Sequence, residues 1–432
     1  MAPERGTLLA AAERASGRPG QGGAWFLARI SVFWLGLSTM WGGLNIIYLP
    51  DRVESLVGSE NKGTFLGLLV AAGLLVAVVV QPVMGAVSDR SRSRWGRRRP
   101  FMVAGSLLSS LFLLLMGVAG TFPLLFAALF FLQISANSAH GPYQGVIPDL
   151  VPRERRGRAS GFFGTANLLG TVIGAFAGGQ LLDRGLGGHF VVLAAAVLAA
   201  TAVVAALATP EGPAPPPEDL GAVREEFGRR LKELRARPGF AWLMASRLFF
   251  FMGLLSADNT MLFLIRERIG LEDAGAPTSY ALATLIVVAA VVSVPAGWFS
   301  DAFGRRKLVA LACGLGVAAS ALLVFATTYP AVLAGMAVLG LGVGAFTASD
   351  WAFAIDLIPD PRAPGLYMGL TNVATAGGDA IATLTAGLVL DSFNRIQPLL
   401  GYPAVFILMM VYFSLSALAL TRIPAGSGAR AA

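Results

Sequence analysis

Charged residues, histidines and cysteines are scarce in this chain. Charged residues make up 13% of its 432 residues, whereas about a quarter is usual in a soluble globular domain. Because Cys313 is the single cysteine, a disulfide within the chain is excluded. The chain has only two histidines in addition, so a dedicated metal site is not expected. The sequence also lacks a phosphate-binding glycine loop, a nucleophile elbow and paired metal ligands. We therefore expect neither a cofactor nor an enzymatic activity.

Long apolar runs are abundant instead. Apolar residues account for 55% of the chain, and the runs repeatedly reach the roughly 20 residues that a helix needs to cross a bilayer. Twelve such runs lie at 26–50, 63–85, 100–119, 122–147, 159–182, 189–209, 240–264, 278–300, 308–327, 329–352, 365–390 and 401–421. This pattern predicts an all-α membrane protein with twelve transmembrane helices.

Positive charge follows the turns between these runs. If the N-terminus is cytoplasmic, most of the 33 Lys and Arg residues fall on the cytoplasmic side, and such an excess sets the orientation of membrane proteins. The six on the other side are Arg52, Lys62, Arg184, Arg266, Arg268 and Arg395. We therefore expect both termini in the cytoplasm, a multi-pass protein of the plasma membrane (the inner membrane of a bacterium) and no nucleic-acid partner.

The two halves of the chain repeat each other. The stretch at 85–99 reads GAVSDRSRSRWGRRR and is echoed at 297–307 by GWFSDAFGRRK. Each half also has a span of small residues that ends in GGQLLD, at 178–183, or in AGLVLD, at 386–391. A proline-rich linker separates the halves. The expected units are a cytoplasmic tail (1–25), a six-helix bundle (26–209), a cytoplasmic linker (210–239), a second six-helix bundle (240–421) and a short cytoplasmic tail (422–432).

Two six-span halves, a long linker and a Gly-x-x-x-Asp-Arg loop after the second span resemble the major facilitator superfamily. The resemblance covers nearly the whole chain. Within the superfamily, SDRSRSRWGRRRPF at 88–101 resembles the loop of the sucrose/proton symporters and the wider glycoside–pentoside–hexuronide:cation symporters. The resemblance implies a monomeric secondary active transporter in the lipid bilayer, with a small solute and a proton as its partners and alternating access as its mechanism.

The resemblance also implies a gate at the cytoplasmic ends of the helices. Asp89 would meet the N-terminus of the eleventh span near Gly365, where free backbone N–H groups favour an anion. Asp301 would act in the same way toward the fifth span near Arg158. Such contacts would favour the outward-open state. The expected gate residues are Gly85, Asp89, Arg90, Gly96, Arg97, Asp149, Arg158, Gly297, Asp301, Gly304, Arg305 and Asp356.

Polar residues inside the spans predict a solute site at mid-membrane, because each is costly in lipid unless it faces a cavity or a partner. The fourth and eleventh spans each carry such residues along one helical face. Their amide and hydroxyl groups suit sugar hydroxyls, and tryptophan can stack on a sugar ring, whereas contacts between helices are the alternative use. The expected binding residues are Trp41, Asn45, Gln133, Asn137, His140, Trp351, Asn372 and Thr375.

A proton-coupled carrier needs a group in its site that takes up and releases a proton. Asp379, beside Gly377 and Gly378 in the eleventh span, is the first choice, followed by Asp258 and Asp350. Arg247 is the cation of this set; it lies about 16 Å from Asp258 along one helix, so these two are not expected to pair directly. In the symporters of the resemblance, important acidic residues lie in the second and fourth spans. Here the second span has none and the fourth has only Asp149 at its cytoplasmic end, and this departure favours proton over sodium coupling.

The sequence therefore predicts a proton-coupled symporter of a small polar solute, a sugar or a glycoside. A proton-coupled exporter of drugs or metabolites is the alternative, because GFFGTANLLGTVIGAFAGG at 161–179 approaches the glycine pattern of such exporters. Ala175 stands where those exporters have a proline. Close helix packing through small residues is therefore the preferred explanation of the glycines.

Overall fold

The described part of the protein is helical. The computed structural model describes residues 23–89, 91–146, 150–151, 156–209, 238–258, 260–357 and 364–423, and no strand occurs among them. Twelve of the helices in this part are long and apolar enough to cross a membrane. The predicted fold class and number of spans are confirmed.

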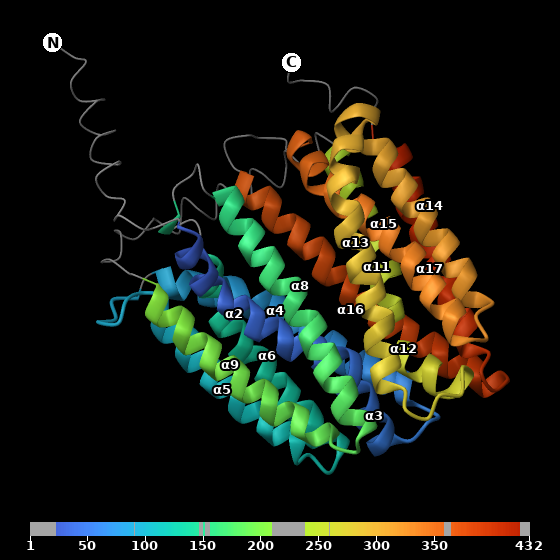
Figure 1. Cartoon of the computed structure of the whole chain (residues 1–432), viewed down its shortest axis with the longest axis horizontal. Coiled ribbons are helices and arrows are strands. Elements are labelled where there is room, and N and C mark those ends of the chain that lie inside the picture. The colour runs from blue at the N-terminus through green and yellow to red at the C-terminus, as the bar shows by residue number, and fades with distance from the viewer. Residues whose placement is uncertain are drawn as a thin grey trace.

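The first half contributes six spans (Figure 1). Its first span is helical from residue 24 to residue 57 and contains one π-helical turn. The helices are α2 (Ala24–Gly43), η1 (Leu44–Tyr48) and α3 (Leu49–Val57), which together form the first span, then α4 (Lys62–Asp89), α5 (Arg99–Gly117), α6 (Phe122–Gln144), α8 (Arg156–Asp183) and α9 (Gly187–Ala208).

The second half has the same order of spans. Its first span is again interrupted by a π-helical turn. The helices are α11 (Pro238–Asp258), α12 (Met261–Phe263) and η3 (Leu264–Arg268), which together form the seventh span, then α13 (Gly275–Phe303), α14 (Arg305–Val324), α15 (Tyr329–Asp356), α16 (Pro364–Ile396) and α17 (Gly401–Thr421).

The first and seventh spans are longer than their apolar runs. The predicted runs ended at residues 50 and 264, whereas the helices continue to Val57 and Arg268. Pro50 does not stop the first span; it lies in the first turn of α3, directly after the π-helical turn, where the ladder of i→i−4 hydrogen bonds is already interrupted. The predicted ends were wrong because the charged residues beyond them have partners in neighbouring helices.

Repeated arginine contacts extend the internal symmetry. Arg52 donates to the carbonyl of Ala119, just past α5, at 2.6 Å, and Arg268 donates to that of Val324 at the end of α14 at 2.9 Å. The unsatisfied carbonyls at a helix C-terminus favour such cations. In each half, therefore, an arginine at the end of the π-helical turn or shortly after it binds the end of the third span.

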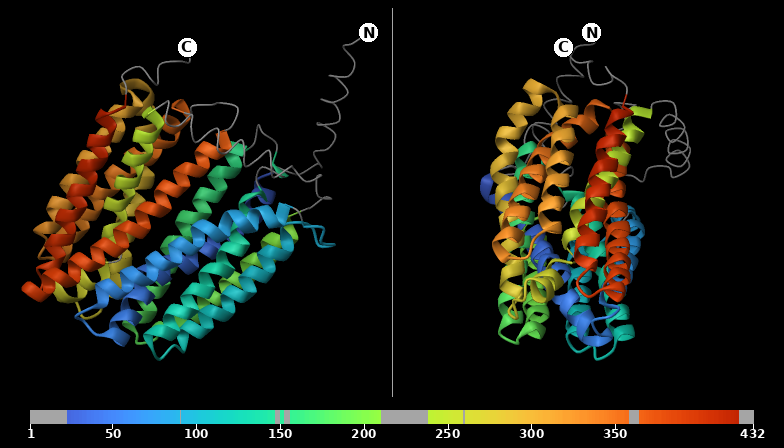
Figure 2. Two further views of the ribbon diagram at one scale, coloured as in Figure 1. Left: turned by 180° about the vertical axis from the view of Figure 1, so that it is seen from behind. Right: turned by 90° about the vertical axis from the view of Figure 1, so that its right-hand side faces the viewer.

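The two halves are bundles that meet along two helix pairs. Between the halves, α4 packs on α16, and α8 packs on α13. In Figure 1, α8 and α13 approach each other at the lower end and diverge toward the upper end. Figure 2 shows the same divergence from behind for α4, in blue, and α16, in orange. We call the end where α4 begins and α16 ends the closed end, and the opposite end, which carries residues 91–99, the basic end.

Glycines allow close helix packing within both bundles. A Cβ atom on Gly170 would collide with the carbonyl oxygen of Leu35, and one on Gly174 with that of Thr39, so α8 lies directly against α2. In the second half, the ring of Phe413 fits between Gly253 and Gly316 in the same way. The packing explanation therefore holds for Gly170 and Gly174 of the fifth span, whereas a Cβ atom on Gly161 would meet nothing within 4 Å.

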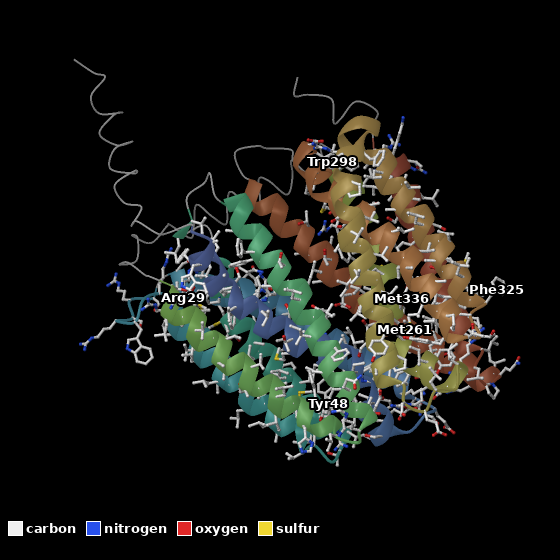
Figure 3. All side chains as sticks on the ribbon, viewed as in Figure 1. Arg29, Tyr48, Met261, Trp298, Phe325 and Met336 are labelled. Atoms are coloured by element: carbon white, nitrogen blue, oxygen red, sulfur yellow. The ribbon has the colours of Figure 1, made fainter. Side chains whose placement is uncertain are left out.

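Exposed tryptophans gather at the basic end. Trp25, Trp95 and Trp298 are 75%, 69% and 74% exposed, and Trp298 is labelled at the upper end of Figure 3. Tryptophan is enriched where a membrane meets water, because its ring is apolar and its N–H is polar. These side chains are therefore placed to anchor this end at a membrane surface.

Candidate transport site and gates

Some of the predicted site residues lie outside the described part of the protein. Arg90 and Asp149 lie outside the described residues. The side chains of Arg158, Asp301, Trp351 and Asn372 are likewise not described.

Gln133 and Asn137 lie buried between α6 and α4. Asn137 Nδ2 donates to the carbonyl oxygen of Gln133 at 2.8 Å and to its Oε1 at 3.0 Å. A Cβ atom on Gly73 of α4 would lie 2.8 Å from the Gln133 amide nitrogen. Gln133 and Asn137 are each 6% exposed. In this conformation, their described hydrogen bonds join them to each other.

His140 joins three helices of the first half. Its Nδ1 lies 3.3 Å from Nε2 of Gln81 on α4, and its Nε2 lies 3.3 Å from Nε2 of Gln144. The ring of Trp34 on α2 packs edge to face against the imidazole, with ring centroids 4.6 Å apart. The two amides can turn to donate or to accept, so they can bind the imidazole in its neutral or its protonated form.

Trp34 extends the predicted polar face of the first span. Trp34, Ser38, Trp41 and Asn45 follow one another at intervals of four, three and four residues, which is one face of a helix. Ser38 accepts a hydrogen bond of 3.0 Å from Asn167 on α8, and Trp41 and Asn45 are half-buried. Trp34 was missed as a site residue, although its spacing from Trp41 was the signal for it.

Arg247 and Asp350 form a buried ion pair in the second half. Arg247 Nη1 contacts Asp350 Oδ2, and the two residues are 6% and 1% exposed. Arg247 Nε also donates to the carbonyl oxygen of Thr371 and to Oγ1 of Thr375, both at 3.1 Å. The guanidinium lies over the ring of Phe251 at 5.2 Å. Arg247 thereby links α11, α15 and α16, and its anionic partner is Asp350.

Asp379 and Asp258 remain apart from that ion pair. Both are half-buried, and they lie close enough to interact electrostatically. Thr383 Oγ1 donates to the backbone carbonyl of Asp379 at 2.9 Å and to its Oδ1 at 3.2 Å. Among the described residues, no salt bridge to either carboxylate is found.

Gly378 brings α11 and α16 together beside Asp379. A Cβ atom on Gly378 would lie 2.8 Å from the carbonyl oxygen of Leu248 and 3.3 Å from Cβ of Phe251. The expectation that this glycine lets a neighbouring helix approach is confirmed. Asp258 is at the end of α11 and Asp379 is on α16, so this packing places two carboxylates on facing helices.

At the basic end, Asp89 has a partner in its own half. Arg98 Nη2 lies 2.6 Å from Asp89 Oδ1, and Arg98 Nη1 donates to Ser88 Oγ at 2.7 Å. The Asp89 side chain is 53% exposed. The Arg98 guanidinium packs over Gly145, just beyond α6.

The repeated loops share a turn that requires glycine. Gly96 has φ 98° and Gly304 has φ 91°, values that L-residues with a side chain rarely adopt. The residue after Gly304, Arg305, forms an ion pair with Asp356. A Cβ atom on Gly85 would make only ordinary contacts and one on Gly297 would make none, so in this conformation neither glycine is needed for packing.

A charged network joins the halves at the closed end. Lys62 is 1% exposed and contacts Glu54, at 2.7 Å, and Glu267. Arg266 binds Asp51 at 2.8 Å and Glu54 at 2.9 Å. Asp51, Glu54 and Lys62 belong to the first half, and Arg266 and Glu267 belong to the second. Sequence reasoning missed this network, although the opposite charges that follow the first and seventh apolar runs were a signal for it.

Two bundles of six membrane-spanning helices, related by an internal repeat and carrying buried charges, define a membrane transporter. Residues 30–289 and 272–431 match the family model of the Major Facilitator Superfamily, and the chain belongs to this family. The predicted resemblance is confirmed.

Sugar transporters are among the curated relatives. The chain is 29% identical over 169 residues to the general alpha-glucoside permease of Schizosaccharomyces pombe, which covers 35% of this chain and 30% of that protein. It is 27% identical over 157 residues to the sucrose transport protein SUC3 of Arabidopsis thaliana, which covers 31% of this chain and 26% of that protein. The match thus spans less than a third of either relative.

Solved structures share the fold. The nucleoside transporter NupG has a TM-score of 0.68 at 14% identity and covers 92% of this chain and 98% of its own. A bacterial homologue of the human lysosomal transporter Spinster, in an inward-facing and unoccupied conformation, has a TM-score of 0.70 at 15% identity and covers 96% of both chains. The family and these relatives are transporters.

Proposed function

We propose that the protein is a proton-coupled symporter of a sugar or glycoside and works by alternating access. The observation that carries the coupling is the pair of half-buried carboxylates, Asp258 and Asp379, on facing helices. A carboxylate inside a membrane protein is costly unless it has a function or a partner. The partial similarity to sucrose and alpha-glucoside permeases supports the solute class.

The first half offers groups that suit a sugar. A pyranose ring has an apolar face, on which an indole can stack, and a rim of hydroxyls that donate and accept hydrogen bonds. Trp34 and Trp41 lie on one face of α2, and His140 contacts both Trp34 and the amide of Gln81. We assign the solute to this face of the first half, together with the predicted binding residues Asn45 and Asn137.

The second half offers the proton site. When Asp258 and Asp379 are both ionised, their charges repel each other across the contact between α11 and α16. Uptake of one proton removes that repulsion and lowers the cost of holding the site away from water. Proton binding and the packing of these helices are thereby linked.

Arg247 and Asp350 serve the same half as a fixed pair. Their charges offset each other, and Arg247 also donates to one carbonyl oxygen and one hydroxyl oxygen of α16. We assign them the role of keeping α11, α15 and α16 in register around the proton site. In this role, the pair stays ionised through the cycle.

The orientation follows the positive charge. We place the basic end in the cytoplasm of a bacterial cell and the closed end on the outer side of its inner membrane. The bundles diverge toward the basic end, so the described conformation corresponds to the one that faces the cytoplasm. We expect the transporter to act as a monomer.

Uptake into proteoliposomes tests the proposal. We expect vesicles with an acidic exterior to accumulate radiolabelled sucrose or maltose, and we expect a protonophore to abolish the accumulation. A panel of sugars, glycosides and nucleosides that is tested for thermal stabilisation of the purified protein identifies the ligand, because a ligand of the folded state raises the melting temperature. Proton-driven efflux of a ligand that is not a sugar would establish the exporter alternative instead.

A further inference from the structure

Asp391 binds the N-terminus of a helix in the other half. It lies near the C-terminal end of α16, and its Oδ1 and Oδ2 accept hydrogen bonds from the backbone N–H groups of Gly63, at 3.1 Å, and Thr64, at 2.6 Å. Both donors belong to the first turn of α4, where no helical carbonyl is available to them. Asp391 is 1% exposed, so water does not replace these contacts in this conformation.

Asp183 makes the equivalent contact at the second helix pair. It is the last residue of α8, and its Oδ1 and Oδ2 accept hydrogen bonds from Gly275 N, at 2.8 Å, and Ala276 N, at 2.7 Å. These donors lie in the first turn of α13. Asp183 and Asp391 are the aspartates that end the repeated motifs at 178–183 and 386–391. The two contacts are therefore related by the internal symmetry.

Glycines bring the helices close enough for these contacts. A Cβ atom on Gly387 would collide with the carbonyl of Gly63, and one on Gly179 with that of Gly275. Each glycine lies four residues before its aspartate, one helical turn away on the same face. At both junctions, therefore, the same pair of residues, a glycine and an aspartate, meets the start of the partner helix.

Electrostatics makes each contact depend on the meeting of the two halves. Asp183, as the last residue of α8, lies in the unfavourable field of its own helix, and at both contacts the N-terminus of the partner helix favours the carboxylate. Separation of the halves at the closed end would leave both carboxylates without these donors and expose four N–H groups. The contacts stabilise only the conformation in which the closed end is shut.

The basic end carries the counterparts of these aspartates. Asp89 ends α4 and Asp301 lies near the end of α13, so each of the four helices at the interface carries an aspartate at its C-terminal end. In the described conformation, Asp391 and Asp183 bind across the interface, whereas Asp89 binds Arg98 within its own half.

We propose that Asp183 and Asp391 are a latch that holds the closed end shut and must release before the transporter can open on that side. The latch is built into the helix pairs α8–α13 and α16–α4. It concerns the conformational equilibrium and does not depend on the nature of the solute or the coupling ion.

Distances between spin labels test the latch. On a Cys313→Ser background, one labelled pair, Ser59→Cys with Gln397→Cys, reports on the closed end, and a second pair, Ser93→Cys with Lys307→Cys, reports on the basic end. Ser59, Gln397, Ser93 and Lys307 are all exposed. Pulsed electron spin resonance on purified protein then gives the populations of the two conformations without any substrate.

We expect Asp183→Asn or Asp391→Asn to shift the ratio of the conformations by about tenfold away from the one described, because an amide keeps one acceptor but faces the second N–H with its own donor. The closed-end distance lengthens and the basic-end distance shortens. The double variant shifts further. Asp273→Asn, which changes an exposed carboxylate at the same end, is the matched control and leaves both distances unchanged.

Unchanged distances in both single variants, with melting temperatures that show a folded protein, would overturn the proposal. An equal shift in Asp273→Asn would overturn it too, because the effect would then be one of general charge. If the double variant does not fold, the single variants carry the comparison. Failure of sugar transport would disprove the proposed function but not the latch.

Discussion

At the scale of single residues, Asp379 shows how a carboxylate can have a local partner and still be free to exchange a proton. Thr383 donates to its Oδ1 at 3.2 Å, and its half-buried position leaves part of the side chain accessible. Arg247, the cation of the predicted coupling set, is bound to Asp350 instead. Asp379 therefore has no described cation to hold it in the ionised form.

We expect Asp379→Asn to abolish uphill accumulation of the solute and to preserve downhill exchange. The amide is nearly isosteric and keeps an acceptor for Thr383, so the fold and the solute site remain, whereas the proton site is lost. Accumulation under an imposed pH gradient, and exchange of labelled for unlabelled solute without a gradient, measure the two activities in the same vesicles. If Asp379→Asn accumulates solute and Asp258→Asn does not, the coupling role belongs to α11.

The buried ion pair makes a prediction about stability. Arg247→Gln or Asp350→Asn alone leaves a buried charge without its partner, and we expect a loss of about 3–5 kcal/mol in the free energy of unfolding. The combined variant Arg247→Met with Asp350→Leu removes both charges and should recover most of that loss. Thermal unfolding of the three purified variants in detergent makes the comparison. Losses in the single variants that add up in the combined variant would show that the two residues do not act as a pair.

At the scale of helices, packing across α2 and α8 depends on residues without side chains. Gly174 lies against the backbone of Thr39, whereas a Cβ atom on Gly161, on the same helix, would meet nothing within 4 Å. The two glycines therefore provide a matched test of close packing. Both substitutions to alanine remove the same helix-weakening residue, so only the contact differs.

We expect Gly174→Ala to lower stability by about 1–3 kcal/mol, because the added methyl group forces α2 and α8 apart. Gly161→Ala should be neutral or slightly stabilising, since alanine favours a helix by up to about 1 kcal/mol over glycine. Melting temperatures in detergent and the yield of folded protein provide the measurements. Equal melting temperatures for the two variants would mean that α8 can move away from α2 at little cost.

Local patterns in the sequence predicted the helices well and the contacts between helices less well. The twelve spans and the repeated loops were visible because apolar runs, glycines and charge clusters are properties of neighbouring residues. The predicted ends of the first and seventh spans were too early, because charged residues such as Asp51 and Glu54 are typical of loops, whereas in the fold they are paired with Arg266. A helical face shows which residues share a side and does not show which helix lies opposite.

For this reason, the sequence predicted neither the partner of Arg247 nor the contacts that join the halves at the closed end. The sequence indicated that Asp258 would not pair with Arg247 but did not show which residue would, and only the packing of α15 against α11 brings Asp350 to it. Asp183 and Asp391 were visible as the ends of a repeated motif. Their function depends on donors 92 and 328 residues away in the chain, which no local pattern reveals.

At the scale of the whole molecule, contacts at the two ends of the interface favour opposite conformations of the same four helices. The closed end is held by Asp183 and Asp391, which accept hydrogen bonds from α13 and α4. Asp89 lies at the other end of α4, where it is paired with Arg98. If it is to meet the N-terminus of α16, as the resemblance implies, the halves must close at the basic end and separate at the closed end. Within the pair α4–α16, the start of α4 would then be capped in one conformation and the start of α16 in the other.

We expect Asp89→Asn to shift the equilibrium toward the described conformation, the opposite direction from Asp391→Asn. The substitution removes the anion that would stabilise the start of α16 when the basic end is shut, while the contacts of the closed end remain intact. It also removes the ion pair with Arg98, but the Asp89 side chain is 53% exposed there, so we expect that loss to be the smaller one. Transport should fall, and solute binding should be largely unaffected.

Arg92→Gln, which changes an exposed residue of the same loop, is the control. The two spin-labelled pairs that report on the latch measure the shift, and the variant that combines Asp89→Asn with Asp391→Asn should return toward the parent distribution. A shift of Asp89→Asn in the same direction as Asp391→Asn would show that the two aspartates do not oppose each other across the interface.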